Sequence, residues 1–252
     1  MSDKNIALIV ARLNSSRLPN KNIMQICNKP MISLLIDRVK KSDFVDEVVI
    51  ATSDKETDDR LEILANDIGI GIYRGPLDNV MGRINGAAKE FNANNIIEIL
   101  GDNPLVNHFL IDDVAEIFKK NKSDYSATAT TEYPLLDNST SFFSIGLRVQ
   151  IYKSKVALEY ENFRELLGPD DHPSSFIFNN PKHFKISFLE AKGNWAFMNR
   201  PSLNFAVNYE KNFKLIKKIF EHFEDNLSEF TLKEMYEFLD ENPSLYTLLG
   251  PE

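Results

Sequence analysis

Short apolar runs alternate with segments of helical periodicity from residue 6 to residue 120. The apolar runs predict strands at residues 6–11, 47–52, 70–73 and 95–100. Between them, apolar side chains recur at the spacing of one helix face and predict helices at residues 30–41, 53–69, 78–91 and 111–120. Strands that alternate with helices are typical of a doubly wound α/β domain with a mostly parallel sheet.

The pattern becomes irregular after residue 123, where a polar, turn-rich stretch at residues 132–141 interrupts it. Short β-like segments predict a small β-rich lobe, at residues 125–131, 144–152, 174–178, 184–189 and 203–207. Two amphipathic helices, at residues 212–223 and 231–240, should close the chain. We therefore treat residues 1–252 as one domain with a core (1–123), a second lobe (124–205) and C-terminal helices packed on the core (206–252).

Composition narrows the class of protein. With 43% hydrophobic and 26% charged residues the chain can bury a sizeable core. A formal net charge of −8 argues against nucleic-acid binding, so an anionic ligand must meet a local basic cluster. The one cysteine, Cys27, excludes an internal disulfide and makes the cytoplasm the default location. Apolar stretches are too short for a signal sequence or a membrane span, so we expect no membrane partner.

Cationic and small polar residues follow the first predicted strand, at the edge where open parallel sheets bind ligands. Arg12, Arg17 and Lys21 stand here together with Asn14 and Ser15. Backbone N–H groups, guanidinium forks and an ammonium group are suited to a triphosphate. The loop lacks glycine, so it matches neither the dinucleotide fingerprint nor the Walker A motif. It predicts a triphosphate site, with a solvated basic loop as the alternative.

Three other segments follow predicted strands. Asp102, in Gly101-Asp102-Asn103-Pro104, offers Mg²⁺ a hard oxygen ligand, although an ordinary Asp-Asn-Pro turn has the same residues. Arg74 comes directly after the third strand, and Asp78 can cap the next helix. Ser53 and Glu56 have the spacing of a capping box, which predicts that a helix begins at Ser53.

In their residues and order these segments resemble the cytidylyltransferases that activate acidic sugars. This group includes the CMP-Kdo and CMP-acylneuraminate synthetases, and the resemblance is strongest to its spore-coat-polysaccharide branch. The family loop Ala-Arg-x-Gly-Ser-x-Arg-Leu-Pro-Gly-Lys is matched by residues 11–21, and Gly-Asp-x-Pro-Leu by residues 101–105. Residues 28–31 and 46–52 match further family segments, and residues 171–174 resemble a Glu-His-Val-Thr element. The resemblance implies a Rossmann-like, GT-A-like nucleotidyltransferase fold.

The resemblance also implies an activity and its residues. CMP would be transferred from CTP to an acidic sugar, a 3-deoxy-ulosonic or nonulosonic acid, with release of pyrophosphate, for surface polysaccharide biosynthesis. Arg12, Lys21 and Asp102 would be catalytic, and Asp102 with Asn208 would hold Mg²⁺. The nucleotide would contact Ala11, Arg12, Leu13, Asn14, Ser15, Arg17, Lys21, Ser53, Arg74 and Gly101. His172 and Arg148 would bind the acceptor, and the second lobe would form a homodimer contact.

The chain departs from the family pattern at two kinds of position. Asn14, Asn20 and Asn28 replace glycines, and asparagine tolerates positive φ, so we expect the loop path to survive. Asn208 replaces an aspartate, which predicts either weaker metal binding, because an amide oxygen lacks charge, or help from Glu210. The alternatives are another nucleotide or acceptor, such as guanylyl transfer to a sugar phosphate; a glycosyltransferase, which would normally carry Asp-x-Asp; and a nucleotide-binding protein that has lost catalysis.

Overall fold

The computed structural model describes residues 3–167, 172 and 174–249. Seven strands of this part form one sheet in the order β5-β4-β1-β6-β8-β7-β9. Their bounds are β1 (Asn5–Val10), β4 (Glu47–Ser53), β5 (Gly71–Gly75), β6 (Asn95–Leu100), β7 (Tyr125–Thr128), β8 (Gln150–Lys153) and β9 (Ile186–Leu189). Strands β5, β4, β1 and β6 are parallel neighbours, and only β8 pairs antiparallel, between β6 and β7. The predicted doubly wound, mostly parallel sheet is confirmed.

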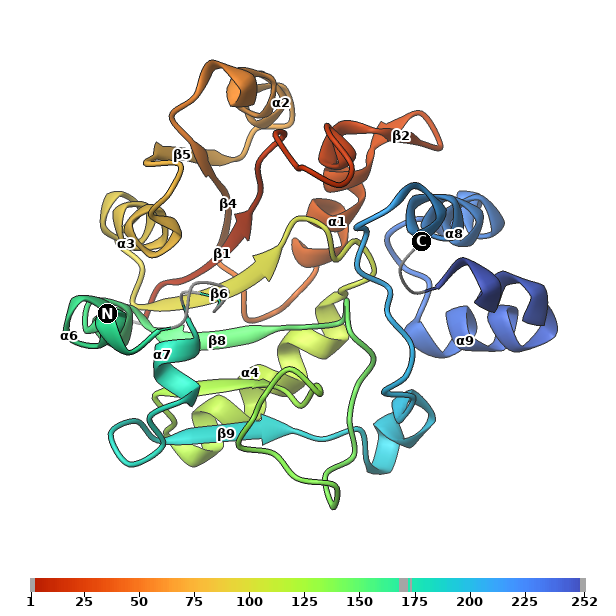
Figure 1. Ribbon diagram of the computed structural model, residues 1–252. Coiled ribbons are helices and arrows are strands. Elements are labelled where there is room, and N and C mark those ends of the chain that lie inside the picture. Colours follow the sequence, from red (N-terminus) through yellow and green to blue (C-terminus); the bar gives the residue numbers. More distant parts are fainter. Residues whose placement is uncertain (1–2, 168–171, 173, 250–252) are drawn as a thin grey trace.

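Helices cover both faces of this sheet (Figure 1). Their bounds are α1 (Met31–Val39), α2 (Asp59–Asp67), α3 (Val80–Glu90), α4 (His108–Asn121), α5 (Ser154–Ala157), α6 (Tyr160–Phe163), α7 (Ser175–Phe178), α8 (Glu210–His222) and α9 (Leu232–Glu241). Alternate residues of β1 belong to opposite cores: Ala7 and Ile9 pack with α1, α4, α8 and α9, whereas Ile6 and Leu8 pack with α3, α5 and α7. None of the helices in the described ranges is long and apolar enough to span a bilayer.

Several predicted boundaries are wrong. Ser53 is the last residue of β4 and pairs with Gly75, so α2 begins six residues later at Asp59. Asn79 caps α3 in place of Asp78, because its side chain accepts a hydrogen bond from the Gly82 N–H group at 2.7 Å. Residues 174–178 form a short helix, and residues 203–207 make one isolated bridge where a strand was expected. The β-like residues 125–131 and 144–152 form strands only at 125–128 and from 150 onward.

The rest of the chain extends the same sheet and then returns to the core. The described residues of 124–205 contribute β7, β8 and β9 to this sheet, with β8 next to β6, and form no separate sheet of their own. The C-terminal helices pack beside α1 (Figure 1), held there by the buried Arg38. Its guanidinium donates to the carbonyl oxygens of Val106, Leu227 and Phe230. A short hairpin, β2 (Gln25–Ile26) with β3 (Lys29–Pro30), leads into α1.

Candidate functional site

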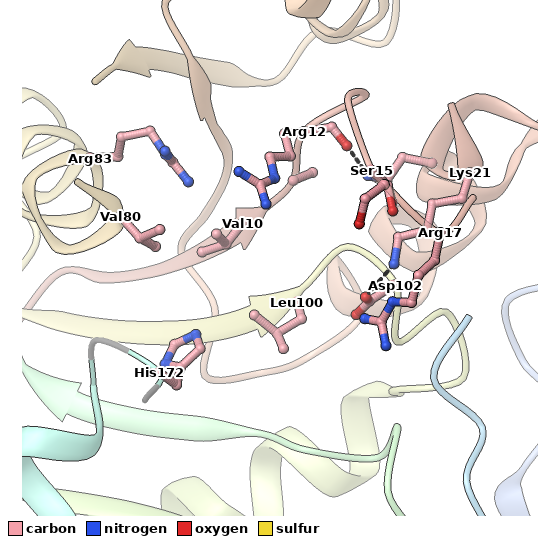
Figure 2. A pocket seen from close by; sticks show the side chains of 13 residues that line it. Val10, Arg12, Ser15, Arg17, Lys21, Val80, Arg83, Leu100, Asp102 and His172 are labelled. Atoms are coloured by element: carbon pink, nitrogen blue, oxygen red, sulfur yellow. Dashed lines mark hydrogen bonds and ion pairs between the residues drawn. The ribbon is translucent and has the colours of Figure 1, made fainter. Parts of the chain in front are cut away.

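A cavity of about 280 Å³ opens at the carboxyl ends of β1 and β6 (Figure 2). Among the residues predicted from the sequence, it is lined by Ala11, Arg12, Ser15, Arg17, Lys21, Asp102 and His172. These residues are up to 161 positions apart in the chain, since they run from Ala11 to His172. The topology therefore brings the cationic loop, the end of β6 and the segment before α7 to one place.

The loop after β1 is fixed at its base by Asp58, whose side chain is buried. The Leu13 N–H group donates to Asp58 Oδ1 at 2.7 Å. Asp58 Oδ2 accepts hydrogen bonds from Thr52 Oγ1 at 3.0 Å, from the Ser53 N–H group at 3.2 Å and from Ser53 Oγ. Hydrogen bonds to a charged acceptor are the strong kind, so this carboxylate ties the start of the loop to the end of β4.

The asparagines that stand in for family glycines have different conformations. Asn20 and Asn28 both adopt φ of 60°, which confirms that asparagine replaces glycine in a left-handed conformation at these two positions. Asn14 is not among the described residues with positive φ, so no such requirement explains it. Asn22, close to the loop's end, donates from Nδ2 to the Arg12 carbonyl oxygen at 3.0 Å and closes the loop on itself.

Lys21 and Asp102 form the electrostatic centre of the cavity. Lys21 Nζ lies 2.6 Å from Asp102 Oδ2 and donates to the Val207 carbonyl oxygen at 2.8 Å. The Val207 N–H group in turn donates to the Asp102 carbonyl oxygen at 2.9 Å, which places Asn208 beside the end of β6. Arg17 donates to Asn208 Oδ1 at 2.8 Å. The loop cations thus contact both residues that were predicted to hold the metal.

Asp102 fits one side of a magnesium site. Its Oδ1 atom is buried and has no hydrogen-bond partner among the described residues, so it can serve as one hard oxygen ligand. Asn208 offers an amide oxygen, although Arg17 contacts it. Residues 3–167, 172 and 174–249 contain no group of three or more His, Cys, Asp or Glu side chains placed to hold a metal. An ion here would take its other ligands from phosphate oxygens and water, which is usual for Mg²⁺.

His172 enters the cavity above a buried polar network. Its Nε2 lies 3.2 Å from Glu98 Oε1, and its Nδ1 lies 2.8 Å from Ser174 Oγ. Glu98 has no exposed surface and accepts a hydrogen bond from the Tyr152 hydroxyl at 2.6 Å. Burial lowers the pKa of His172, with Glu98 opposing this effect, so the ring is neutral near pH 7. Asp171 and Pro173 of the Asp-His-Pro-Ser match lie outside the described residues.

Two arginines assigned from the sequence do not reach the cavity. Arg74 pairs with Asp59 and Glu62 of α2, each at 2.6 Å, and its side chain is absent from the lining. Arg148 is buried, and its Nη2 donates to Gln150 Oε1 at 2.7 Å. In this structure Arg74 joins β5 to α2, and Arg148 belongs to the interior network behind His172. The contacts of Arg74 with nucleotide and of Arg148 with the acceptor stay predictions.

Four other predicted contacts are indirect or peripheral. Ser53 and Leu13 are buried and contribute through their bonds to Asp58. Gly101 is not in the lining, and an added Cβ would lie 2.9 Å from the Ala11 Cβ, so a larger residue would push the loop away. Asn14 is exposed and outside the lining. Their contact with nucleotide stays a prediction.

Sequence reasoning missed three side chains that matter here. Arg83 lines the cavity from α3, although only Arg74 of this segment was chosen. Asp58 and Glu98 are buried carboxylates, one holding the loop and one behind His172. Glu98 offered a signal, because a charged residue inside the apolar run of β6 is rarely buried without a partner. Asp58 offered none, because its partners become neighbours only through folding.

Comparison with known proteins agrees with this geometry. The sequence profile described as Cytidylyltransferase matches residues 6–165. The spore coat polysaccharide biosynthesis protein SpsF of Bacillus subtilis is 26% identical over 95% of this chain and 95% of its own length. A 3-deoxy-manno-octulosonate cytidylyltransferase of Bdellovibrio bacteriovorus is 32% identical over 46% of each chain. The structure of a cytidylyltransferase from Leptospira borgpetersenii has a TM-score of 0.81 at 20% identity, covering 97% of both chains.

The matched segment runs from β1 through α6 and therefore includes the cationic loop, Asp102 and the strands that carry them. The SpsF match extends over nearly the whole chain, and the fold is that of a solved cytidylyltransferase. The chain belongs to the cytidylyltransferase family of nucleotidyltransferases.

Proposed function

We propose that this protein transfers CMP from CTP to a hydroxyl group of an acidic sugar and releases pyrophosphate. The observation that carries the proposal is the meeting of Arg12, Arg17 and Lys21 with Asp102 in one cavity at the carboxyl ends of β1 and β6. Relatives named 3-deoxy-manno-octulosonate cytidylyltransferases support the choice of a sugar acid. SpsF supports a role in surface polysaccharide synthesis.

The loop cations would bind and neutralise the triphosphate. Arg12 makes no ion pair with another described residue, so its guanidinium is available to phosphate oxygens. Lys21, only 9% exposed at its side chain, already lies in the cavity and would hold phosphate with little loss of side-chain freedom. Charge that builds up as pyrophosphate leaves is stabilised by cations placed in advance, which is the main source of rate in phosphoryl transfer.

Asp102 and Asn208 would hold Mg²⁺, which supplies Lewis-acid polarisation of the phosphates when bound. The free Oδ1 of Asp102 is the anionic ligand the chain provides. Asn208 contributes no charge, so affinity for the ion depends on the triphosphate more than in a site with two aspartates.

The acceptor would enter by the His172 end of the cavity. Both ring nitrogens have protein partners, and burial lowers the pKa of His172, so this side chain shapes the wall without adding a charge to it. The acceptor hydroxyl must face the α-phosphorus on the side opposite the leaving pyrophosphate for in-line attack. We also propose, from the family resemblance alone, that the protein works as a cytoplasmic homodimer, which light scattering on the purified protein would test.

Pyrophosphate release, measured with four nucleoside triphosphates against a panel of sugar acids and sugar phosphates, tests the proposal. We expect release that needs CTP, Mg²⁺ and a 3-deoxy-ulosonic or related acid, and that Asp102→Ala abolishes. Glu56→Gln is the matched control, since it removes one exposed charge outside the cavity. Release with GTP and a sugar phosphate would replace the proposal with guanylyl transfer. Nucleotide binding without turnover on the whole panel would indicate an inactive relative.

A further inference from the structure

Arg83 is a buried cation that the triphosphate assignment does not use. It sits in the first turn of α3, is 2% exposed and lines the cavity. It forms no ion pair with any residue in the described part of the chain. A buried arginine without a carboxylate partner is unusual, because burial of an unpaired charge is costly.

The hydrogen bonds of Arg83 leave one edge of its guanidinium free. Nη1 donates to the carbonyl oxygens of Pro76 at 2.8 Å and Leu77 at 2.7 Å, which fixes the plane of the group. Within the described part of the chain, the buried Nε has no hydrogen-bond partner, and no bond of Nη2 joins it to another residue. Nε–H and Nη2–H lie side by side on one edge, so the free edge is a planar pair of donors.

The position of Arg83 separates it from the phosphate end of the cavity. Figure 2 shows Lys21, Arg17 and Asp102 together on one side and Arg83 with Val80 on the other, with Val10, Leu100 and Arg12 between them. Aliphatic side chains offer a flat aromatic ring a surface and offer phosphate nothing. If the triphosphate lies at Lys21, the nucleobase lies toward Arg83.

We propose that Arg83 is the side chain that selects cytosine, by donating from its free edge to the O2 and N3 atoms of the base. The inference rests on the proposed function. Cytosine presents two adjacent acceptors, O2 and N3, whereas uracil carries a hydrogen on N3, so the same pair of donors would meet a donor there. A site built on such donors rejects the wrong partner because a buried polar group is then left without a hydrogen bond.

Selection of cytosine requires the planar pair of guanidinium donors, Nε–H and Nη2–H, and not the positive charge alone. Lysine at this position would keep the positive charge but would offer no planar pair of donors. The two hydrogen bonds from Nη1 hold the guanidinium group of Arg83 in place before the base arrives, so little side-chain entropy is lost when the base binds. The positive charge of Arg12, which lies near Arg83 across the cavity, repels the positive charge of Arg83. This repulsion favours an electron-rich ligand between the two guanidinium groups.

Equilibrium binding of nucleotides to the wild-type protein tests the proposal without any substitution. Calorimetry would compare CTP, UTP and two CTP analogues, one with carbon in place of N3 (3-deaza) and one without the 4-amino group. We expect the 3-deaza analogue and UTP to bind roughly 5- to 150-fold more weakly than CTP, which is the usual discrimination of a two-bond contact. The analogue that lacks the 4-amino group keeps both acceptors and should lose less. Equal binding of CTP and the 3-deaza analogue would overturn the inference.

Two variants assign the selection to Arg83. Arg83→Lys and Arg83→Gln should bring the CTP-to-UTP affinity ratio close to one, because a merely structural loss would weaken both nucleotides alike. Arg60→Gln, which removes an exposed arginine from α2, should keep the wild-type ratio. An unchanged ratio in a folded Arg83 variant contradicts the inference, and a specific loss of acceptor affinity would assign Arg83 to the acceptor. If wild-type protein binds no CTP at all, the proposed function fails and this inference with it.

Discussion

Asp58 offers the sharpest test of how the phosphate-binding loop is held. Asp58→Asn keeps the size and shape of the side chain but removes its charge and turns one of its two acceptor atoms into a donor. In the native chain Oδ1 accepts from the Leu13 N–H group and Oδ2 from the Ser53 N–H group. An amide oxygen can serve only one of these backbone donors, and its NH₂ group then faces the other.

The loss of one acceptor atom sets the expected loss of stability. Both N–H groups belong to buried residues, and a buried donor without a partner costs about 1–3 kcal/mol. The retained bond also loses its charge assistance, which makes such bonds about twice as strong as neutral ones. We therefore expect Asp58→Asn to lower the free energy of unfolding by at least about 1–3 kcal/mol, a large share of the roughly 5–15 kcal/mol of a typical domain.

Urea unfolding followed by circular dichroism would measure the loss, and calorimetry would measure CTP affinity in the same samples. Glu56→Gln also removes one negative charge, at an exposed position two residues before Asp58. Its free energy of unfolding should stay within about 0.5 kcal/mol of the wild-type value. We expect weaker CTP binding by Asp58→Asn, because the base of the loop is no longer tied to β4. Stability and affinity equal to those of Glu56→Gln would refute the role of Asp58.

Three further outcomes are expected at the cavity. Asp102→Asn should lower kcat for pyrophosphate release about 10²–10³-fold with an unchanged circular dichroism spectrum, as for loss of one electrostatic group; retention of wild-type kcat would exclude Asp102 from the chemistry. Asn208→Asp should lower the magnesium concentration that gives half-maximal activity, because it adds a charged ligand; an unchanged or higher concentration would argue against metal contact. Because the pKa of His172 is lowered in the folded protein, the unfolded chain binds a proton at this histidine at a higher pH than the folded chain does. Protonation then favours the unfolded chain, so the free energy of unfolding should fall as pH drops through 6.5, the ordinary histidine value. His172→Gln should make this decline shallower in urea unfolding across that pH range, and identical slopes would contradict the shift.

The sequence predicts most of the core half of the fold because strands β1, β4 and β6 are continuous apolar runs. Such runs reflect burial on both faces of a parallel sheet, which is a property of the strand itself. The second half is predicted less well. Residues 174–178 form too short a segment to separate a strand from a single helical turn, and the place of β8 between β6 and β7 depends on pairing with residues far along the chain.

The same distinction applies to the site. Arg12 and Asp102 come soon after the ends of β1 and β6, and Arg17 and Lys21 belong to the loop that follows β1, so the edge of the sheet indicates where all four lie. Arg74 and Arg83 show the limit of such prediction, since Arg74 lies in β5 and Arg83 in α3, and only tertiary contacts decide which of them reaches the cavity. Asp59 and Glu62 draw Arg74 toward α2, whereas the carbonyl oxygens of residues 76 and 77 hold Arg83 at the cavity. No local pattern carries that information.

The 2.6 Å contact of Lys21 with Asp102 has a consequence for the order in which ligands arrive. Each group is the counter-ion of the other in the free protein, so a bare magnesium ion would add a second cation to a carboxylate that Lys21 already neutralises, and a bare triphosphate would approach a carboxylate. If the proposed magnesium site is correct, a nucleotide that carries its magnesium would let Lys21 pair with phosphate while Asp102 holds the metal. Charge would then stay balanced, and the magnesium–nucleotide complex would be the species that binds.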